Sequence, residues 1–372
     1  MPRSTSTLTG TITLRHSAFV LSAVVLSALV LSACRTPQAP PAEELPKPLE
    51  ATVIPPQPEI VLQNPYAQVD WATHRQHRAN LHTHTRNSDG LHGVARVIDL
   101  YREAGYTILA ISDHNHVTWP WSAYGRDPGA LEMAAIPANE ISDTHHIGSY
   151  FSEYNINGRR YRPIIGRMGL PPTAVTETEV LEGIGQAGGL AVFFHPGRYD
   201  YPAEWYLDYY ERFPHLIGLE VVNRADRYPQ DRELWDAILR STMPDRPVWG
   251  FANDDTHRRA HLGHAYNVFP LAELSAEAVR EAMERGAFYF SNGREAPVID
   301  AVVLDPEAGT VTISGTGYHT LTWISEGRHV ARGETLSYHK QANIGSYLRA
   351  ELHGPGGISY TNPFAVTPAA AD

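Results

Sequence analysis

Short apolar runs alternate with amphipathic segments from Arg78 onward. The runs that we expect to be strands are ANLHTH, TILAISDH, MAAIPANEIS, HIGSYF, LAVFFHP, LIGLEVVN and VWGFANDD. Between them, apolar residues recur at the spacing of a buried helix face, for example at Val94, Val97, Ile98 and Tyr101. Helices are predicted over 94–105, 176–189, 232–241 and 274–286. Because strands and helices alternate, the pattern favours an α/β fold with a parallel sheet or barrel over a sandwich.

The pattern changes after Gly293, where apolar positions alternate with a period of two. The segments VIDAVVLD, TVTISGTG, TLTWISEG and YLRAELHG are typical of strands separated by glycine turns. We therefore expect a barrel over residues 66–296 and a small β-rich domain over residues 297–372. A chain of this length accommodates one large α/β domain and a small partner.

The first 34 residues have the layout of a lipoprotein signal peptide over 1–33. Residues 1–16 are basic and contain no acidic residue, and an apolar run over 18–33 leads to Cys34. The residues LSAC at 31–34 are similar to the bacterial lipobox, and Cys34 is the only cysteine of the chain. A buried structural thiol is the alternative interpretation of Cys34. We expect cleavage after residue 33, lipidation of Cys34, and a lipid anchor in the bacterial cell envelope.

Residues 34–65 are rich in proline and lack an apolar period, so we expect an extended tether. Arg35 stands where an aspartate is usually linked with inner-membrane retention, which favours the outer membrane, facing the periplasm. Without Arg3 and Arg15, 28 basic residues face 41 acidic ones, a formal charge of −13. This charge argues against nucleic acid as the main partner. A single cysteine excludes disulfides within the chain.

Nearly every predicted strand ends in a residue that can bind a metal ion. In chain order these are His82, His84, Asp113, His114, Glu140, His145 or His146, His195, Glu220, Asp255 and His257. Side chains at the carboxyl ends of the strands of a β/α barrel converge on one mouth. Histidines scattered over a core or a surface would not follow the strands in this way. The pattern therefore predicts a metal site at the mouth of a barrel.

Six motifs that contain these residues resemble, in this order, the PHP (polymerase and histidinol phosphatase) family of metal-dependent phosphoesterases. They are LHTHTRNSDG, AISDHN, ANEIS, HHIGSY, FFHPGR and NDDTH, and the resemblance covers roughly residues 76–292. It implies a distorted (β/α)7 barrel that holds two or three divalent metal ions. Zinc, manganese and iron all suit histidine and carboxylate ligands.

The resemblance also implies how the ligands are shared among the ions. One ion would take His82, His84, Glu140 and Asp255, and Glu140 would bridge to a second ion held by His146 and His195. A third ion would take Asp89, His114 and His257. Of the two histidines in HHIGSY we expect His146 to be the ligand, which leaves His145 as a supporting residue or a substrate contact. Asp254 is expected to orient the ligands of NDDTH.

The reaction implied by the resemblance is the hydrolysis of a small-molecule phosphate ester by a metal-bound hydroxide. Glu140, Asp255 and His257 would be the catalytic residues among the ligands. Arg198, Arg224 and Arg258 follow ligand motifs and are candidates for binding the phosphate, although surface arginines are common. No serine or cysteine nucleophile motif is evident.

Three functions remain open from the sequence. The first is a phosphoesterase, the second is a carboxylic-ester or carbamate hydrolase that uses the same site, and the third is a surface lipoprotein that binds a glycan or protein with structural metals. The segment over 152–172 carries four arginines and is a lid for an anionic substrate, a patch for anionic lipid, or a solvated loop. Trp119, Trp121 and Tyr124 either wall the pocket or pack beneath a loop.

Overall fold

Seven strands form a barrel in the order in which they occur in the chain. They are β2 (Arg75–Asn80), β3 (Ile108–Ile111), β4 (Ala134–Ile141), β5 (Ile147–Tyr150), β6 (Leu190–Phe193), β7 (Leu216–Asn223) and β8 (Trp249–Asn253). All pairs are parallel except that β5 runs antiparallel to both β4 and β6. A parallel bridge between Thr83 and Thr256 joins the two ends of this series. The predicted α/β class and distorted seven-stranded barrel are therefore confirmed.

The computed structural model describes residues 60–143, 145–156 and 175–369. The predicted signal peptide, Cys34, most of the predicted tether and the four arginines of the 152–172 segment lie outside these residues. The described residues belong to one compact unit. Within them, no helix has both the length and the apolar character needed to cross a membrane.

Six α-helices occur in the described residues. They are α1 (Val94–Glu103), α2 (Pro128–Leu131), α3 (Glu177–Gln186), α4 (Ala203–Arg212), α5 (Asp231–Thr242) and α6 (Ala276–Arg285). At the start of α3, Thr176 and Glu179 form a reciprocal capping box. Helix α4 was not predicted, because it is rich in aromatic residues and has no side-chain cap. Its signal in the sequence is the pair Tyr206 and Tyr210, four residues apart and both buried.

Alternate residues of the barrel strands face different cores. Leu190, Val192 and Phe194 belong to one apolar cluster with the other strands, whereas Ala191 and Phe193 pack with the aromatic residues of α4 and α5. This period of two is the reason why β6 is apolar along its whole length, because both of its faces are buried.

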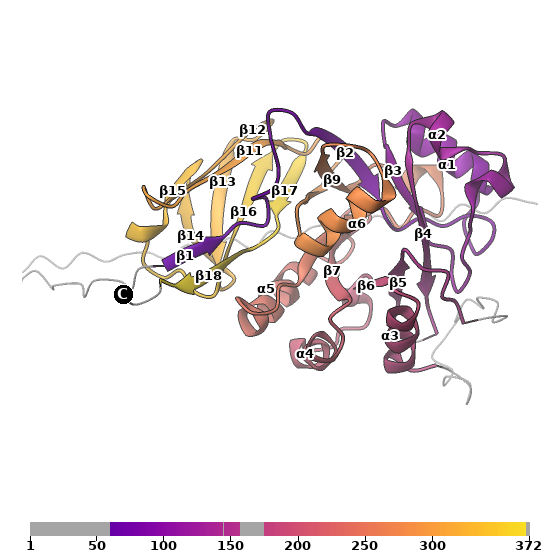
Figure 1. The fold of residues 1–372 in the computed structure, drawn as a ribbon, viewed down its shortest axis with the longest axis horizontal. Helices are drawn as coiled ribbons and strands as arrows, with labels where there is room; N and C mark the ends of the chain where they lie inside the picture. Colours follow the sequence, from indigo (N-terminus) through magenta and orange to yellow (C-terminus); the bar gives the residue numbers. More distant parts are fainter. Residues whose placement is uncertain (1–59, 144, 157–174, 370–372) are drawn as a thin grey trace, which may run out of the picture. The chain divides into compact units, whose positions relative to one another are not determined.

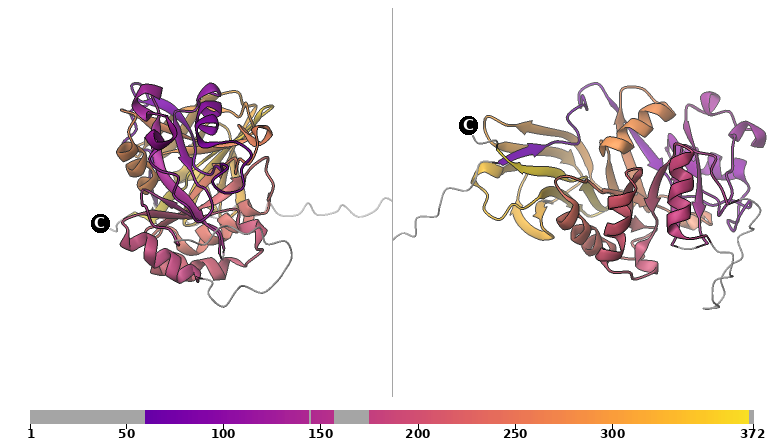
Figure 2. Two further views of the ribbon diagram at one scale, coloured as in Figure 1. Left: turned by 90° about the vertical axis from the view of Figure 1, so that its right-hand side faces the viewer. Right: turned by 60° about the horizontal axis from the view of Figure 1, so that its bottom comes forward.

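Most of the C-terminal strands continue the barrel sheet. They comprise β9 (Ala265–Leu271), β10 (Tyr289–Asn292), β11 (Val298–Asp305), β12 (Thr310–Thr316), β13 (Thr320–Ser325), β14 (Arg328–Arg332), β15 (Thr335–Ser337), β16 (Tyr347–Gly354), β17 (Gly357–Thr361) and β18 (Phe364–Pro368). Strand β9 pairs with β2, and β10 pairs with β9 and β17 (Figures 1 and 2). The predicted boundary at 296/297 lies between β10 of this sheet and β11, which forms a separate three-stranded sheet with β12 and β15, whereas the later strands β13, β14, β16, β17 and β18 return to the larger sheet.

Two further contacts tie the C-terminal strands to the rest of the chain. Strand β1 (Ile60–Gln63) pairs with β18. The tether predicted over 34–65 is therefore wrong for these four residues, which belong to a sheet. Leu62 is buried there, and its apolar burial stabilises the added edge strand. On the other side, the buried Arg349 guanidinium bonds to both carboxylate oxygens of Asp236 in α5, at 2.8 and 2.6 Å, and to Glu351 at 2.7 Å.

Candidate metal centre

Every strand of the barrel except β7 brings a candidate ligand to the same end. His82 and His84 follow β2, His114 follows β3 and His195 follows β6. His146 precedes β5, and because β5 is antiparallel to its neighbours, its first residue lies at the end where the other strands finish. The reversal of β5 explains why the HHIGSY motif comes before its strand, whereas the other ligand motifs come after theirs.

Four ligand atoms enclose the first ion position. His82 Nε2 lies 3.1 Å from His84 Nε2, 3.3 Å from Glu140 Oε2 and 3.6 Å from Asp255 Oδ1. His84 Nε2 lies 3.1 Å from Glu140 Oε2 and 3.3 Å from Asp255 Oδ1. A tetrahedral site with metal–ligand bonds of about 2.0–2.1 Å has edges of about 3.3–3.4 Å. The five measured edges therefore fit one tetrahedral ion.

Glu140 lies between two groups of histidines. Its Oε1 lies 2.5 Å from His146 Nδ1 and 3.1 Å from His195 Nε2. Its Oε2 faces His82 and His84, and also His114 Nδ1 at 3.1 Å. The two oxygens thus point into different ligand groups, which is the arrangement of a bridging carboxylate. The structure brings together the residues predicted for the first and second ions.

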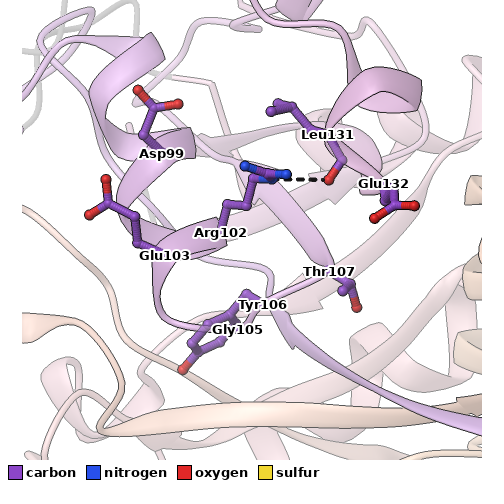
Figure 3. A pocket seen from close by; sticks show the side chains of 8 residues that line it. All are labelled: Asp99, Arg102, Glu103, Gly105, Tyr106, Thr107, Leu131 and Glu132. Atoms are coloured by element: carbon purple, nitrogen blue, oxygen red, sulfur yellow. Dashed lines mark hydrogen bonds between the residues drawn. The ribbon is translucent and has the colours of Figure 1, made fainter.

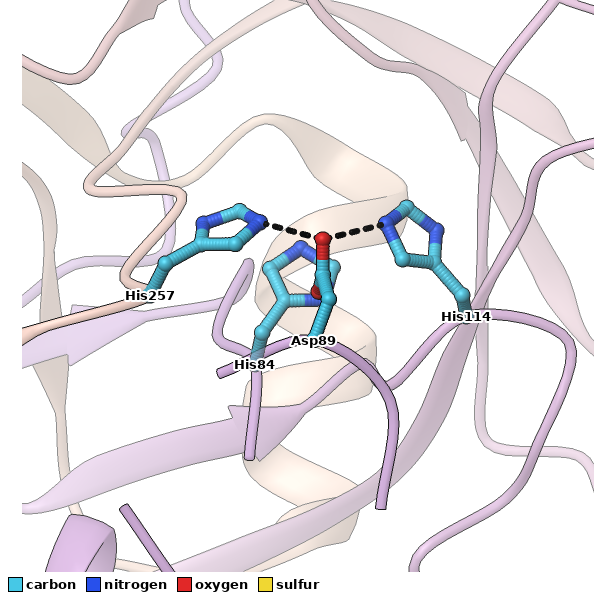
Figure 4. A group of neighbouring side chains, drawn as sticks. All are labelled: His84, Asp89, His114 and His257. Carbon is cyan, nitrogen blue, oxygen red and sulfur yellow. Dashed lines mark hydrogen bonds and ion pairs between the residues drawn. The ribbon is translucent and has the colours of Figure 1, made fainter. Parts of the chain in front are cut away.

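A third group lies next to the first and is more open to solvent. His84, Asp89, His114 and His257 each offer a ligand atom within 4.8 Å of the others (Figure 4). Asp89 Oδ2 lies 3.1 Å from His257 Nε2 and 3.7 Å from His114 Nε2. The side chains of Asp89 and His257 are 29% and 24% exposed, whereas His84 is buried. This group therefore forms the solvent side of the cluster, and His84 borders two ion positions.

The hydrogen bonds of His82 and His257 favour tautomers that leave a nitrogen free to bind a cation between these ligands. The backbone carbonyl of Asp255 lies 2.9 Å from His257 Nδ1, so a neutral His257 carries its proton there and turns a lone pair toward the Asp89 carboxylate. Likewise, Glu220 Oε1 accepts from His82 Nδ1 at 3.1 Å, so His82 Nε2 turns a lone pair toward Glu140. A lone pair that faces a carboxylate is repelled by it unless a proton or a metal ion lies between the two groups.

The pKa values of His84, His146 and Glu140 are shifted by their burial and by the charges of their neighbours. Burial lowers the pKa of His84, but Asp255 and Glu140 outweigh it and raise the pKa to about 10. Burial also lowers the pKa of His146, to about 3, although Glu140 opposes this. Burial opposes ionisation of Glu140, yet the facing His146, His114 and His82 rings hold its pKa well below the ordinary value. Protons on some histidines therefore balance the buried carboxylates where no ion does.

Two buried carboxylates outside the ligand set orient it. Glu220 bonds to His82, and its Oε2 accepts the backbone N–H of His195 at 2.9 Å. Asp113 accepts from Thr85 N–H and Oγ1, Ser88 Oγ and Thr118 Oγ1 at 2.7, 2.6, 2.7 and 2.5 Å, which fixes the loop that carries Asp89. Both carboxylates end or lie within strand motifs, and that position was their signal in the sequence. Their supporting role, rather than a ligand role, was missed.

Asp254, expected to orient the ligands, has a different set of partners. It accepts the backbone N–H groups of Gly263, His264 and Ala265 and the hydroxyl of Tyr101. Burial raises its pKa to about 6 despite these bonds. Asp254 therefore holds the loop before β9, and the Tyr101 hydroxyl, which also bonds to Thr256 Oγ1, connects its carboxylate to a second residue of the NDDTH motif.

Aromatic packing sets the position of His82. Its ring stacks on Phe194 with centroids 3.8 Å apart. A Cβ atom at Gly148 would lie 2.3 Å from Phe194 Cζ, so only glycine leaves room for this ring. Of the three aromatic residues considered for a pocket wall, Trp121 is buried in the core, and Trp119 and Tyr124 pack against the same core cluster.

The three predicted phosphate-binding arginines have different surroundings. Arg224 Nη2 lies 2.8 Å from Asp255 Oδ2 and 3.4 Å from His257 Nδ1, so this side chain reaches the ligands. Arg198 is exposed on the turn that follows His195. Arg258 is also exposed, and its Nε donates to His261 at 2.8 Å rather than to a ligand carboxylate.

A groove elsewhere on the barrel offers no comparable chemistry. It has a volume of 380 Å³ and lies between α1 and the start of β3 (Figure 3). Thr107, which lines it, precedes β3, so the groove is at the opposite end of that strand from His114. Its Arg102 bonds to the carbonyl of Leu131, and its Asp99 pairs with Arg126. None of its lining residues is a histidine.

Several solved structures are similar in fold to this chain, whereas no protein-family model and no curated protein matches it. A two-domain protein of Bacteroides vulgatus that contains a predicted PHP-like metal-dependent phosphoesterase is 17% identical, with a TM-score of 0.46, over 79% of this chain and 96% of that one. An amidohydrolase from Chromobacterium violaceum is 18% identical, with a TM-score of 0.40, over 56% and 96%. The lesion-specific endonuclease of Pyrococcus furiosus is 14% identical, with a TM-score of 0.36, over 67% and 62%.

These similarities include a PHP-like phosphoesterase, as the sequence motifs led us to expect. The chemistry of the site is therefore inferred from the side chains of this chain alone. The fold and the site define a β/α-barrel protein with a buried cluster of histidines and carboxylates suited to divalent metal ions.

Proposed function

We propose that this protein is a metal-dependent phosphoesterase that holds two or three divalent ions of zinc, manganese or iron. The observation that carries the proposal is the bridging position of Glu140, whose two oxygens face separate histidine groups. His82, His84 and Asp255 would hold the first ion, His146 and His195 the second. Asp89, His114 and His257 would hold a third. A structural metal site typically holds one ion whose coordination positions are all filled by the protein, whereas this cluster has room for several ions and is open to solvent on one side.

Bound divalent ions lower the pKa of water toward neutrality and stabilise negative charge on phosphoryl oxygens. The chain supplies the remaining requirements. Glu220 keeps the coordinating nitrogen of His82 turned inward. Arg224 Nη2 lies 2.8 Å from Asp255 Oδ2, so its guanidinium would place a positive charge beside the phosphoryl oxygens. The partly exposed side at Asp89 and His257 is where water would enter.

Metal content and hydrolysis of three 4-nitrophenyl esters test this proposal together. Purified without chelator, the protein should contain two or three metal equivalents, and it should release nitrophenolate from 4-nitrophenyl phosphate or from bis(4-nitrophenyl) phosphate. Glu140→Gln should lose metal and activity, whereas Glu284→Gln, an equal charge change on an exposed helix residue, should keep both. Activity on 4-nitrophenyl acetate alone would indicate that the protein is a carboxylic-ester hydrolase instead. One equivalent or none after incubation with zinc or manganese would favour a binding protein.

We also propose that the protein is anchored in the cell envelope through lipidated Cys34, at the outer membrane and facing the periplasm. The basic segment, the apolar run and the LSAC sequence support this location. Cells supplied with labelled palmitate should label the wild-type chain and not Cys34→Ser. Equal labelling of both chains would refute the anchor.

A further inference from the structure

Four side chains form a row of rings that leads from the metal centre to solvent. The rings of His195 and Tyr199 lie 6.3 Å apart at 23°, and those of Tyr199 and Tyr201 lie 6.0 Å apart at 19°. The Tyr201 and Trp205 rings are 4.5 Å apart at 31°. We call these four residues the aromatic strip. Its inner end is a metal ligand, and its outer member Tyr201 is 39% exposed.

Hydrogen bonds and packing fix the inner half of the aromatic strip. The backbone N–H of His146 donates to the Tyr199 hydroxyl at 3.1 Å. The buried His145 ring stacks on Tyr199 at 4.2 Å and on Trp205 at 5.5 Å. His145 Nδ1 donates to the carbonyl of His146, so its Nε2 accepts from the Tyr206 hydroxyl, both at 3.0 Å. His145 is thus a neutral support for the strip rather than a ligand.

The outer half of the aromatic strip has features that packing does not explain. Tyr201 is the one aromatic residue among the exposed large apolar side chains of the described ranges. Arg198 lies beside the strip, with its guanidinium carbon 5.9 Å from the centre of the Tyr199 ring. A cation and flat aromatic faces next to an ion site suit a ligand that combines an anionic group with a planar ring.

We propose that the aromatic strip binds the leaving group of the substrate, and that this leaving group is a planar aromatic ring. The inference rests on the proposed function, which places the phosphoryl group at the ions beside Glu140. From His195 the strip leads outward through Tyr199 to the exposed Tyr201, so a flat ring attached to that phosphoryl group can stack on it. An aliphatic leaving group gains little from ring faces.

Calorimetric titration of the zinc-loaded protein with phenylphosphonate and methylphosphonate tests the strip. Neither phosphonate has an ester bond, so the readout does not depend on turnover. The wild type should bind phenylphosphonate about two- to tenfold more tightly than methylphosphonate, which is the range of one aromatic contact. Tyr201→Ala should lose this preference and Tyr201→Phe should keep it. Tyr318→Ala, which removes a partly exposed tyrosine from the C-terminal strands, should also keep it.

The outcomes separate this inference from the proposed function. Equal affinity of the wild type for the two phosphonates, or an unchanged preference in Tyr201→Ala, would overturn the aromatic strip as a subsite while leaving the phosphoesterase intact. Failure of both phosphonates to bind would overturn the proposed function and the subsite with it.

Discussion

Glu220 accepts four hydrogen bonds, and Glu220→Gln removes two of them whichever way the new amide lies. Oε1 accepts from His82 Nδ1 at 3.1 Å and Asn253 Nδ2 at 3.0 Å. Oε2 accepts from the His195 backbone N–H at 2.9 Å and Asn223 Nδ2 at 3.1 Å. The amide keeps one accepting oxygen and turns an NH₂ group toward the other two donors. Each buried donor left unpaired costs about 1–3 kcal/mol, so the free energy of unfolding should fall by about 2–6 kcal/mol.

The same substitution should weaken metal binding, because Glu220 orients two ligands. Loss of such a supporting hydrogen bond typically lowers metal affinity by about 10- to 100-fold. Competition between the protein and a fluorescent zinc chelator measures this affinity, and urea unfolding of the metal-free protein measures the stability. Glu284→Gln is the matched control, because it removes one charge from an exposed side chain. Unchanged zinc affinity in Glu220→Gln would refute the reasoning that Glu220 orients His82 and His195.

Three further changes test other parts of the molecule. His84→Ala should lower metal-dependent hydrolysis by about a hundredfold or more while the circular dichroism spectrum stays the same, because His84 borders two ion positions; near wild-type rates would contradict the ligand assignment. Arg349→Met should lower the free energy of unfolding by about 3–5 kcal/mol, because it leaves buried carboxylates without their partner. Arg285→Met, from an exposed helix pair, should cost less than about 1 kcal/mol, and equal losses in urea unfolding would count against the buried pair. Burial opposes ionisation of Glu351, but His353 and Arg349 lower its pKa to about 2 from 4.5. Glu351 therefore stabilises the fold above pH 4.5 and loses this effect as the pH falls toward 2. Glu351→Gln should flatten that part of the stability curve by about 3 kcal/mol, and an unchanged curve would exclude this role.

The sequence predicted the barrel and its ligands because both depend on local pattern. A strand that is apolar on both faces and ends in a histidine or carboxylate indicates a buried strand with a polar end, and the ends of parallel strands meet. The structure brings His82, Glu140, His195 and Asp255 together accordingly, although the first and the last are 173 positions apart. The choice of His146 over His145 also agrees with the contacts in the structure.

Other features required the tertiary structure, because they depend on neighbours that are distant in the chain. The direction of β5 decides that a motif before a strand lies at the same mouth as motifs after strands. Glu220 is a carboxylate on a barrel strand, as a ligand would be. Its oxygens instead accept hydrogen bonds from the His195 backbone N–H and Asn223 Nδ2, and only the structure shows this. Helix α4 is stabilised by burial of its aromatic residues against β6 and β7 rather than by intrinsic propensity or a cap, and β1 forms because β18 offers an edge.

The sequence by itself therefore determined which residues can form the metal centre and on which kind of scaffold they lie. The tertiary structure decided which nitrogen of each histidine faces the neighbouring ligands, and it placed the two oxygens of Glu140, which the resemblance implies as a bridge, toward separate histidine groups. Residue type and strand period are properties of a local segment, whereas the orientation of a side chain depends on the packing and hydrogen bonds that surround it after the barrel has closed.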